Sequence, residues 1–252
     1  MRLTDFKVLT FDCYGTLIDW ERGMVEALKP LAGKAASPLG RNAILEAHAR
    51  HESLQQAQTP TKAYRDLLAI VYKRLAEEWR VPVDWEECVA YGRSVRDWPA
   101  FPDTAGALQY LKNHYKLVIL SNVDNETFGF SNRKLGVAFD AIYTAEDIGS
   151  YKPSLRNFEY MLANLEGLGF DKQDVLHTAE SMFHDHKPAN RMGLRSCWIY
   201  RRHLDQGFGA TMHPGEMPAY DFQFKSMAEF ANAHQEQLRS EGRAGSAPRI
   251  DP

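Results

Sequence analysis

The 252-residue chain has few cysteines, no long hydrophobic run and no large excess of charge of either sign. It has only three cysteines, Cys13, Cys88 and Cys197, and their spacing is not that of a metal site. An odd and small number of cysteines is more typical of proteins in the reducing cytoplasm than of secreted proteins with disulfides. No apolar stretch approaches the roughly 20 residues that cross a bilayer, and Asp5 and Lys7 argue against an N-terminal signal segment. The net charge of −3 favours neither nucleic acid nor an anionic membrane as a partner. The sequence therefore predicts a cytoplasmic α/β protein.

Short apolar segments alternate with helical patterns along most of the chain. Residues 7–14 (KVLTFDCY) are rich in β-formers and end at Gly15, which predicts a buried strand. Further strands are predicted at 116–122, 139–145, 174–180, 196–202 and 221–226, and helices at 105–115, 125–136, 153–169, 188–194 and 227–238. This alternation predicts a Rossmann-like parallel sheet with right-handed crossovers.

The segment from residue 18 to 98 differs from the rest because strand signals are missing from it. Apolar residues recur there at helical spacing, for example in 44–57, 63–79 and 84–95. We predict an all-helical cap domain, residues 18–98, inserted into a core domain made of residues 1–17 and 99–235. Residues 236–252 are polar, contain Gly and Pro, and are predicted to form a disordered tail.

Polar residues follow the predicted strands at the points where they end. Asp12 ends the first strand, Ser121 and Asn122 end the second, and Lys152 and Asp185 follow later strands. Ligands of parallel sheets bind outside the carboxyl ends of the strands. The convergence of these side chains on one edge predicts a catalytic site there.

Four motifs carry a family resemblance: Asp12-Cys13-Tyr14-Gly15-Thr16, Ser121-Asn122, Lys152-Pro153, and Asp185 within ESMFHDHKPANRMGL. In their order and spacing the chain resembles the haloacid dehalogenase superfamily, and within it the L-2-haloacid dehalogenases, from about residue 5 to residue 230. The resemblance implies a small carboxylate substrate, a homodimer by analogy, and no metal or other cofactor.

The resemblance also implies roles for these residues. Asp12 is the nucleophile that forms a covalent ester, and a desolvated, aligned carboxylate suits that task. Thr16 hydrogen-bonds the nucleophile or nearby backbone, Ser121 binds the substrate carboxylate, and Asn122 holds the departing halide through its amide N–H. Lys152 supplies positive charge that keeps Asp12 ionised.

Asp185 is expected to orient or activate the water that hydrolyses the ester, and its neighbour His184 is a candidate to assist. Typical L-2-haloacid dehalogenases have a serine at Glu180, an asparagine at Met182 and a tyrosine at Phe158. These departures imply that water is positioned differently in this chain.

Tyr14 stands where superfamily phosphatases place a second aspartate that protonates the leaving group. A tyrosine with an ordinary pKa of about 10 is a poor acid near neutral pH, whereas a halide leaves without a proton. The substitution therefore favours displacement at carbon over displacement at phosphorus. The resemblance implies that backbone N–H groups just after the nucleophile, at Cys13 and Tyr14, bind the substrate carboxylate together with Ser121. We expect the side chains of Tyr14 and Trp20 to line the substrate pocket, and Tyr14 to need a hydrogen-bond partner if it is buried.

The family uses a cap arginine to attract the halide, and Arg50 is the candidate here, with Arg41 and Arg65 as rivals. Three alternatives remain open. The same attack could open a strained ring such as an azetidine carboxylate. Glu180 with Asp185 and Asp12 could instead hold Mg²⁺ in a phosphatase, since carboxylates are ligands of that ion. The chain could also be a catalytically silent member that acts through partner binding.

Overall fold

The computed structural model describes residues 1–242 and residue 250. Within them, six strands form one sheet in the order β3-β2-β1-β4-β5-β6, and every neighbouring pair is parallel. The strands are β1 (Val8–Phe11), β2 (Lys116–Ser121), β3 (Ala141–Thr144), β4 (Val175–Ala179), β5 (Arg195–Ile199) and β6 (Phe222–Phe224). The predicted α/β fold with a parallel sheet is confirmed.

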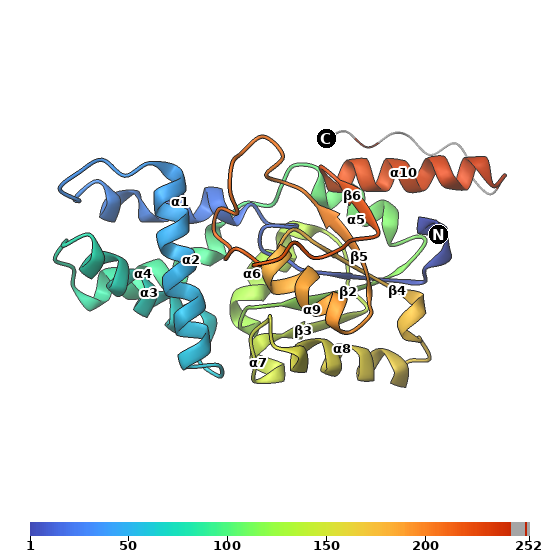
Figure 1. The fold of residues 1–252 in the computed structure, drawn as a ribbon, viewed down its shortest axis with the longest axis horizontal. Helices are drawn as coiled ribbons and strands as arrows, with labels where there is room; N and C mark the ends of the chain where they lie inside the picture. The colour runs from blue at the N-terminus through green and yellow to red at the C-terminus, as the bar shows by residue number, and fades with distance from the viewer. Residues whose placement is uncertain (243–249, 251–252) are drawn as a thin grey trace.

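The two faces of the sheet bury separate hydrophobic clusters, because side chains alternate along each strand. Leu9 and Ile119 face a cluster that includes residues of α5 (Thr104–Leu111), α6 (Asn125–Leu135) and α10 (Met227–Ser240). Val8 and Leu120 face a second cluster formed with α7 (Ala145–Ile148), α8 (Leu155–Gly167) and α9 (Lys187–Arg191). Figure 1 shows α10 and α8 on opposite sides of the sheet.

The insertion between β1 and β2 is helical, as predicted. It contains α1 (Trp20–Ala32), α2 (Arg41–Gln58), α3 (Tyr64–Glu78), α4 (Trp85–Arg93) and the short turn η2 (Ser94–Asp97). Figure 1 shows α1–α4 gathered on one side of the molecule, away from α10. The predicted domain boundaries at residues 17–18 and 98–99 stay predictions.

Helices α3 and α4 pack closely, and Gly92 makes this possible. A Cβ atom at Gly92 would lie 2.1 Å from the backbone oxygen of Arg65, well inside van der Waals contact. Cap and core are joined by polar contacts as well as by packing. The Tyr151 hydroxyl donates to the Lys62 carbonyl at 2.6 Å, and Lys134 Nζ donates to the Trp98 carbonyl at 2.7 Å.

Several local features differ from the prediction. Helix α10 extends to Ser240, so residues 236–240 are helical although the disordered tail was predicted from residue 236. Residues 243–249 and 251–252 of that tail lie outside the described residues. Short turns η1 (Leu3–Asp5) and η3 (Lys172–Asp174), and a π-helical turn η4 (Met182–His186), were not predicted.

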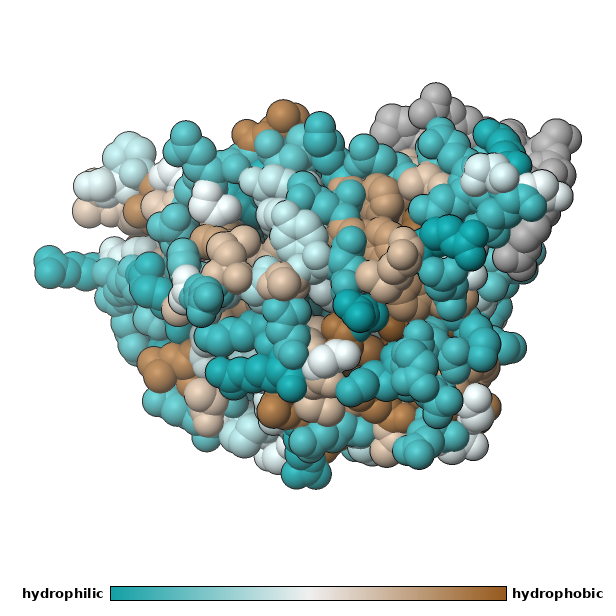
Figure 2. Space-filling view, turned by 45° about the vertical axis from the view of Figure 1, so that its right-hand side comes forward, coloured by the Kyte–Doolittle hydropathy of each residue, from teal (hydrophilic) through white to brown (hydrophobic). Residues whose placement is uncertain are grey.

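The surface agrees with the charge pattern of the sequence. The face in Figure 2 is mostly hydrophilic, with hydrophobic residues in small groups. Among the described residues, no helix is both long and apolar enough to cross a membrane.

Candidate active site

Asp12 follows β1 directly, and its carboxylate is buried at the carboxyl edge of the sheet. Its backbone N–H continues the pairing with β4 by donating to the Thr178 carbonyl at 3.1 Å. Thr16 Oγ1 donates to Asp12 Oδ2 at 2.8 Å, and Lys152 Nζ donates to Asp12 Oδ1 at 2.8 Å. Both carboxylate oxygens are therefore held by donors, which fixes the orientation of the predicted nucleophile.

Lys152 is only 1% exposed, and its ammonium group uses all three of its protons. Besides Asp12, it donates to Asp185 Oδ1 at 2.7 Å and to the Leu120 carbonyl at 2.9 Å. Burial alone would lower the pKa of Lys152, but the two carboxylates outweigh burial and raise its pKa above the usual value. Lys152 is thus a fixed positive charge between the two acids.

Asp185 is held by a second hydrogen-bond donor that sequence reasoning missed. His177 Nε2 lies 2.9 Å from Asp185 Oδ1, and His177 Nδ1 lies 2.9 Å from Thr10 Oγ1. His177 is fully buried in the centre of β4. A histidine inside an otherwise apolar strand was the available signal, because a buried imidazole needs polar partners.

The two carboxyl groups differ in acidity. Burial raises the pKa of Asp12 above its ordinary value, opposed by Lys152 and Thr16. Burial also acts to raise the pKa of Asp185, but Lys152 and His177 together hold it far below its ordinary value. Asp185 is therefore a firmly ionised, weakly basic group, whereas Asp12 is the more basic carboxylate of the pair.

The loop after Asp12 turns sharply. Gly15 has φ of +97°, and a Cβ atom there would lie 2.9 Å from Trp20 Nε1, so the turn and the close approach of Trp20 both require glycine. Thr16 Oγ1 accepts from the Glu180 backbone N–H at 2.9 Å, which ties this loop to the end of β4. The predicted role of Thr16 as a partner of the nucleophile fits this geometry.

A small cavity of about 20 Å³ adjoins Asp12. Its lining residues come from core and cap: Asp12, Tyr14, Asn122, Lys152, Ser181, His184 and Asp185 from the core, and Trp20, Glu52, Gln56 and Tyr64 from the cap. A cavity of this size holds about one water molecule. The cap residues other than Trp20 were not predicted, since no spacing in the helical segments marks them.

The cap arginines lie elsewhere, and among the described residues no arginine lines this cavity. The side chain of Arg50 is 54% exposed and pairs with Glu78 at 2.9 Å, so the structure does not support its predicted place in the halide site. Arg41 pairs with Glu21 at 2.8 Å, and Arg65 pairs with Asp124 at 2.8 Å.

The cap places a carboxyl group, Glu52, at the cavity instead of an arginine. Glu52 is 4% exposed. Gln56 Nε2 donates to Glu52 Oε1 at 3.1 Å, and His48 Nδ1 lies 3.5 Å from Glu52 Oε2. The charged lining residues of the described cavity are thus three carboxyl groups and Lys152. This lining is less favourable to a free anion than an arginine-lined one.

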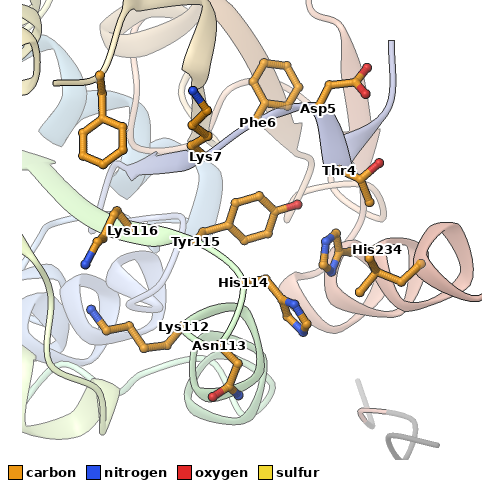
Figure 3. A pocket seen from close by; sticks show the side chains of 12 residues that line it. Thr4, Asp5, Phe6, Lys7, Lys112, Asn113, His114, Tyr115, Lys116 and His234 are labelled. Atoms are coloured by element: carbon orange, nitrogen blue, oxygen red, sulfur yellow. The ribbon is translucent and has the colours of Figure 1, made fainter. Parts of the chain in front are cut away.

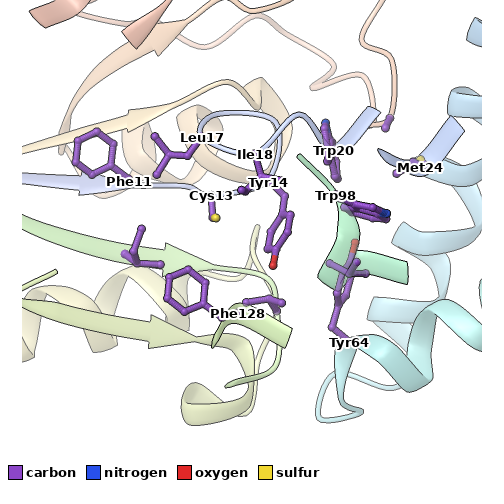
Figure 4. Packing of buried hydrophobic residues seen from close by; sticks show 14 of the residues in the cluster. Phe11, Cys13, Tyr14, Leu17, Ile18, Trp20, Met24, Tyr64, Trp98 and Phe128 are labelled. Atoms are coloured by element: carbon purple, nitrogen blue, oxygen red, sulfur yellow. The ribbon is translucent and has the colours of Figure 1, made fainter. Parts of the chain in front are cut away.

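Tyr14 and Cys13 point in different directions. The Tyr14 hydroxyl pairs with Ser131 Oγ at 2.9 Å, and its ring packs edge-on against Trp98 at 5.9 Å. Figure 4 shows the Tyr14 ring between the core and the cap residues Trp98 and Tyr64. Tyr14 lines the cavity as predicted, but Cys13 is not a lining residue and is fully buried in the hydrophobic cluster.

The ionisation of these two groups follows from their burial. Burial raises the pKa of the Tyr14 hydroxyl well above its ordinary value and does the same for the Cys13 thiol. Tyr14 therefore stays neutral and is a still weaker acid than a free tyrosine. The Cys13 thiol therefore stays protonated in the hydrophobic cluster, and the expected contact of the backbone N–H groups after Asp12 with the substrate carboxylate stays a prediction.

Ser121 and Asn122 end β2 beside Lys152. Asn122 Oδ1 accepts from the Lys152 backbone N–H at 2.7 Å, and its Nδ2 donates to the Lys152 carbonyl at 3.0 Å. Asn122 thus orients the lysine loop as well as lining the cavity. Ser121 is buried, does not line the cavity, and its Oγ has no partner among the described residues.

The residues that depart from the family pattern lie in different surroundings. Phe158 is buried and packs edge-on against His177 with ring centres 5.2 Å apart, and Met182 is buried at the start of η4. Glu180 lines a different cavity of about 180 Å³ together with Arg201 and Arg202. Burial raises the pKa of Glu180 well above its ordinary value, which favours a neutral acid.

These residues do not fit a magnesium site. In the part of the chain that is described, no three His, Cys, Asp or Glu side chains are arranged to hold a metal ion. The Lys152 ammonium already bridges Asp12 and Asp185, and Glu180 faces another cavity. The phosphatase alternative therefore lacks its ligand set.

A larger hollow of about 570 Å³ lies at the opposite edge of the sheet (Figure 3). It includes Lys7 and Lys116, which flank the starts of β1 and β2. Lys7 pairs with Asp174 at 2.9 Å, and Lys116 pairs with Asp140 at 3.1 Å. Its cations are engaged with carboxylates, and it lies at the amino ends of the strands whose carboxyl ends carry the predicted catalytic side chains.

A parallel α/β core, a helical insertion and a buried aspartate–lysine pair at the carboxyl edge of the sheet are the features that the motif resemblance led us to expect. The chain belongs to the haloacid dehalogenase-like hydrolases, whose family model matches residues 6–178. The resemblance inferred from the motifs is confirmed.

Named relatives agree with this family. An (S)-2-haloacid dehalogenase of Pseudomonas putida is 28% identical over 206 residues, covering 79% of this chain and 87% of the relative. A second one, from Pseudomonas fluorescens, is 28% identical over 197 residues, covering 76% and 83%. The L-2-haloacid dehalogenase of Xanthobacter autotrophicus with covalently bound chloropropionic acid has the same fold, with a TM-score of 0.72, 19% identity and coverage of 95% and 100%.

Proposed function

We propose that this protein hydrolyses the carbon–halogen bond of short 2-haloalkanoic acids and releases 2-hydroxy acids. The observation that carries the proposal is the Asp12 carboxylate, buried and aligned by Thr16 and Lys152, with Tyr14 in place of a proton donor. The (S)-2-haloacid dehalogenases among its relatives support the substrate class.

In the first step, an Asp12 oxygen attacks the carbon that bears the halogen, inverts it and releases halide. The leaving halide needs no proton, so the neutral Tyr14 is no obstacle. Water then attacks the Asp12 carboxyl carbon of the ester, and Asp12 is regenerated. The predicted role of Ser121 as a donor to the substrate carboxylate requires its buried Oγ, which has no partner among the described residues, to become accessible from the cavity.

The direct test is chloride release from racemic 2-chloropropionate and from chloroacetate, with chelator present, by wild type and Asp12→Asn. Release by wild type alone, together with an adduct on the Asp12 peptide, is the expected result. Release by both proteins would exclude Asp12 as the nucleophile. Absence of release from wild type would refute the haloacid proposal.

Glu52 favours a second candidate, the opening of a strained ring such as azetidine-2-carboxylate. There the leaving group is a ring nitrogen, which must carry a proton, and a cap carboxyl group suits a cationic leaving group better than a halide. Hydrolysis of azetidine-2-carboxylate by wild type, and its loss in Glu52→Gln with chloride release retained, would establish this activity.

We further infer a cytoplasmic location and a homodimer. The location is supported by three cysteines that are all free and buried. The dimer rests on analogy with the family alone. Sedimentation of the full chain tests it, and a monomer at micromolar concentration would contradict it.

A further inference from the structure

The π-helical turn η4 places an imidazole at the cavity beside Asp185. His184 is 9% exposed and lines the same cavity as Asp12. Its backbone N–H donates to Ser181 Oγ at 3.0 Å, and this cap fixes the start of the turn. The histidine position is therefore set by the loop that follows β4, next to the predicted water-activating acid.

Two buried acceptors at this cavity have no partner among the described residues: His184 Nε2 and Asp185 Oδ2. Both belong to lining residues of a cavity that holds about one water. Leaving a buried polar atom unpaired costs about 1–3 kcal/mol, so each of the two atoms calls for a partner from the cavity, and a water within reach of both would supply a hydrogen to each. Neither atom takes part in holding Asp12.

The other side of the imidazole determines its tautomer. His184 Nδ1 lies 3.2 Å from Ser181 Oγ and 3.4 Å from Thr211 Oγ1, and the two hydroxyls lie 2.9 Å from each other. We assign the proton to Nδ1, donating to this hydroxyl pair, because that leaves Nε2 as an acceptor toward the cavity. Burial lowers the pKa of His184, which keeps the ring neutral near neutral pH.

We propose that His184 is the general base that takes a proton from the water hydrolysing the Asp12 ester, while Asp185 Oδ2 accepts the second hydrogen and orients the water. The role rests on the haloacid hydrolysis proposed above. Asp185 alone is a weak base, because Lys152 and His177 stabilise its ionised form.

The proton and electron pairs balance within this step. The water oxygen bonds to the Asp12 carboxyl carbon as one water proton moves to His184 Nε2. When the tetrahedral intermediate collapses, the bond to the product oxygen breaks, and the imidazolium returns its proton to that oxygen. The remaining proton of the added hydroxyl is lost to solvent, which leaves the Asp12 carboxylate and a 2-hydroxy acid.

The test compares His184→Gln with His186→Gln. His186 belongs to the same buried turn but does not line the cavity, and its ring nitrogens lie 3.0 Å from Ser196 Oγ and from the Ala179 carbonyl. Each variant is mixed rapidly with racemic 2-chloropropionate, and chloride and the Asp12-peptide adduct are measured after quenching. Thermal unfolding shows whether each variant is folded.

We expect His184→Gln to release chloride in a rapid burst and to accumulate the ester, with turnover reduced about 100-fold or more, as for loss of a general base. His186→Gln should keep the wild-type ratio of burst to turnover. If His184→Gln does not fold, Thr211→Val, which removes one Nδ1 partner, should show a smaller accumulation of ester.

Three results would overturn the role. Wild-type turnover in His184→Gln would exclude His184 as the base, and equal loss of burst and turnover would place it in the first step instead. If the wild-type protein releases chloride, the haloacid proposal holds, and either of these two results then speaks against the role of His184 alone. Without that release, both the function and the role fall.

Discussion

Lys152 and Asp12 form a fully internal ion pair, with Nζ 2.8 Å from Oδ1 and a second carboxylate, Asp185, on the same ammonium group. A lysine between two buried acids lets both stay ionised in a site from which water is nearly excluded. The nucleophile therefore depends on a charge from a segment 140 residues away in the sequence.

Replacing Lys152 by Met should leave two buried carboxylates without a counter-charge. We expect a loss of about 3–5 kcal/mol in the free energy of unfolding, and a halide burst that nearly disappears at neutral pH because Asp12 becomes protonated. Chemical denaturation and rapid-quench chloride release measure the two effects. Lys7→Met, which breaks an exposed pair with Asp174, is the control and should change stability by about 1 kcal/mol or less. A normal burst in Lys152→Met would contradict the role of Lys152.

The variant Tyr14→Phe tests whether the Tyr14 hydroxyl takes part in the reaction, because it keeps the ring that lines the cavity and removes only the hydroxyl. The hydroxyl bonds only to Ser131 among the described residues, and halide release needs no acid. We expect a loss of about 1 kcal/mol in stability with kcat for 2-chloropropionate nearly unchanged. Ser131→Ala serves as a matched variant that removes the same bond from the other side. A large fall in kcat for Tyr14→Phe alone would show that the hydroxyl takes part in the reaction.

The rate of the chloride burst should fall at low pH, on the acid limb of its pH profile, because Asp12 becomes protonated there. Its carboxylate is the active form, so the rate falls as pH drops through its pKa, which burial raises above the ordinary value of about 3.9. Asp185 contributes to that rise by repulsion. Asp185→Asn should therefore move the acid limb of the burst to lower pH, even where turnover is lost. A shift to higher pH would contradict this electrostatic account.

Arg50→Ala should leave catalysis unchanged. The side chain is exposed and bonded to Glu78, and exposed pairs contribute about 0–1 kcal/mol. Steady-state kinetics with 2-chloropropionate should give wild-type kcat and KM. A rise in KM would show that Arg50 reaches the substrate after all.

Gly92→Ala should destabilise the cap. The new methyl group would meet the Arg65 backbone oxygen, and a backbone atom cannot move aside without separating α3 from α4. We expect a loss of about 1–3 kcal/mol, typical of overpacking, measured by denaturation. Gly40→Ala is the control, because its Cβ would meet nothing within 4 Å.

The core of the fold and the catalytic edge could be predicted from the sequence because both depend on local patterns. The strand patterns, together with the rule that ligands bind at the carboxyl ends of parallel strands, correctly predicted that Asp12, Lys152 and Asp185 lie close together. The direction of the Cys13 side chain, which points into the hydrophobic cluster, was not predicted. That direction depends on tertiary packing rather than on sequence spacing.

The cap side of the cavity was beyond sequence reasoning for a physical reason. Which face of α2 meets the core depends on how the cap helices cross, and that is set by tertiary packing. Arg50 and Glu52 are two residues apart on the same helix, yet one is exposed and the other is buried at the cavity. Residues two apart on an α-helix lie about 200° apart around its axis, so the choice of the face that meets the core decides the sign of the charge at the cavity.

The cavity beside Asp12 has another consequence. A 2-haloacid is larger than the single water that this space holds, so we expect the cap residues that line it to move away from Asp12 before a substrate enters and again before the hydroxy acid departs. The turnover rate would then include this motion of the cap, which a more viscous solvent slows. Added viscogen should lower kcat while the rate of the chloride burst measured after binding stays the same.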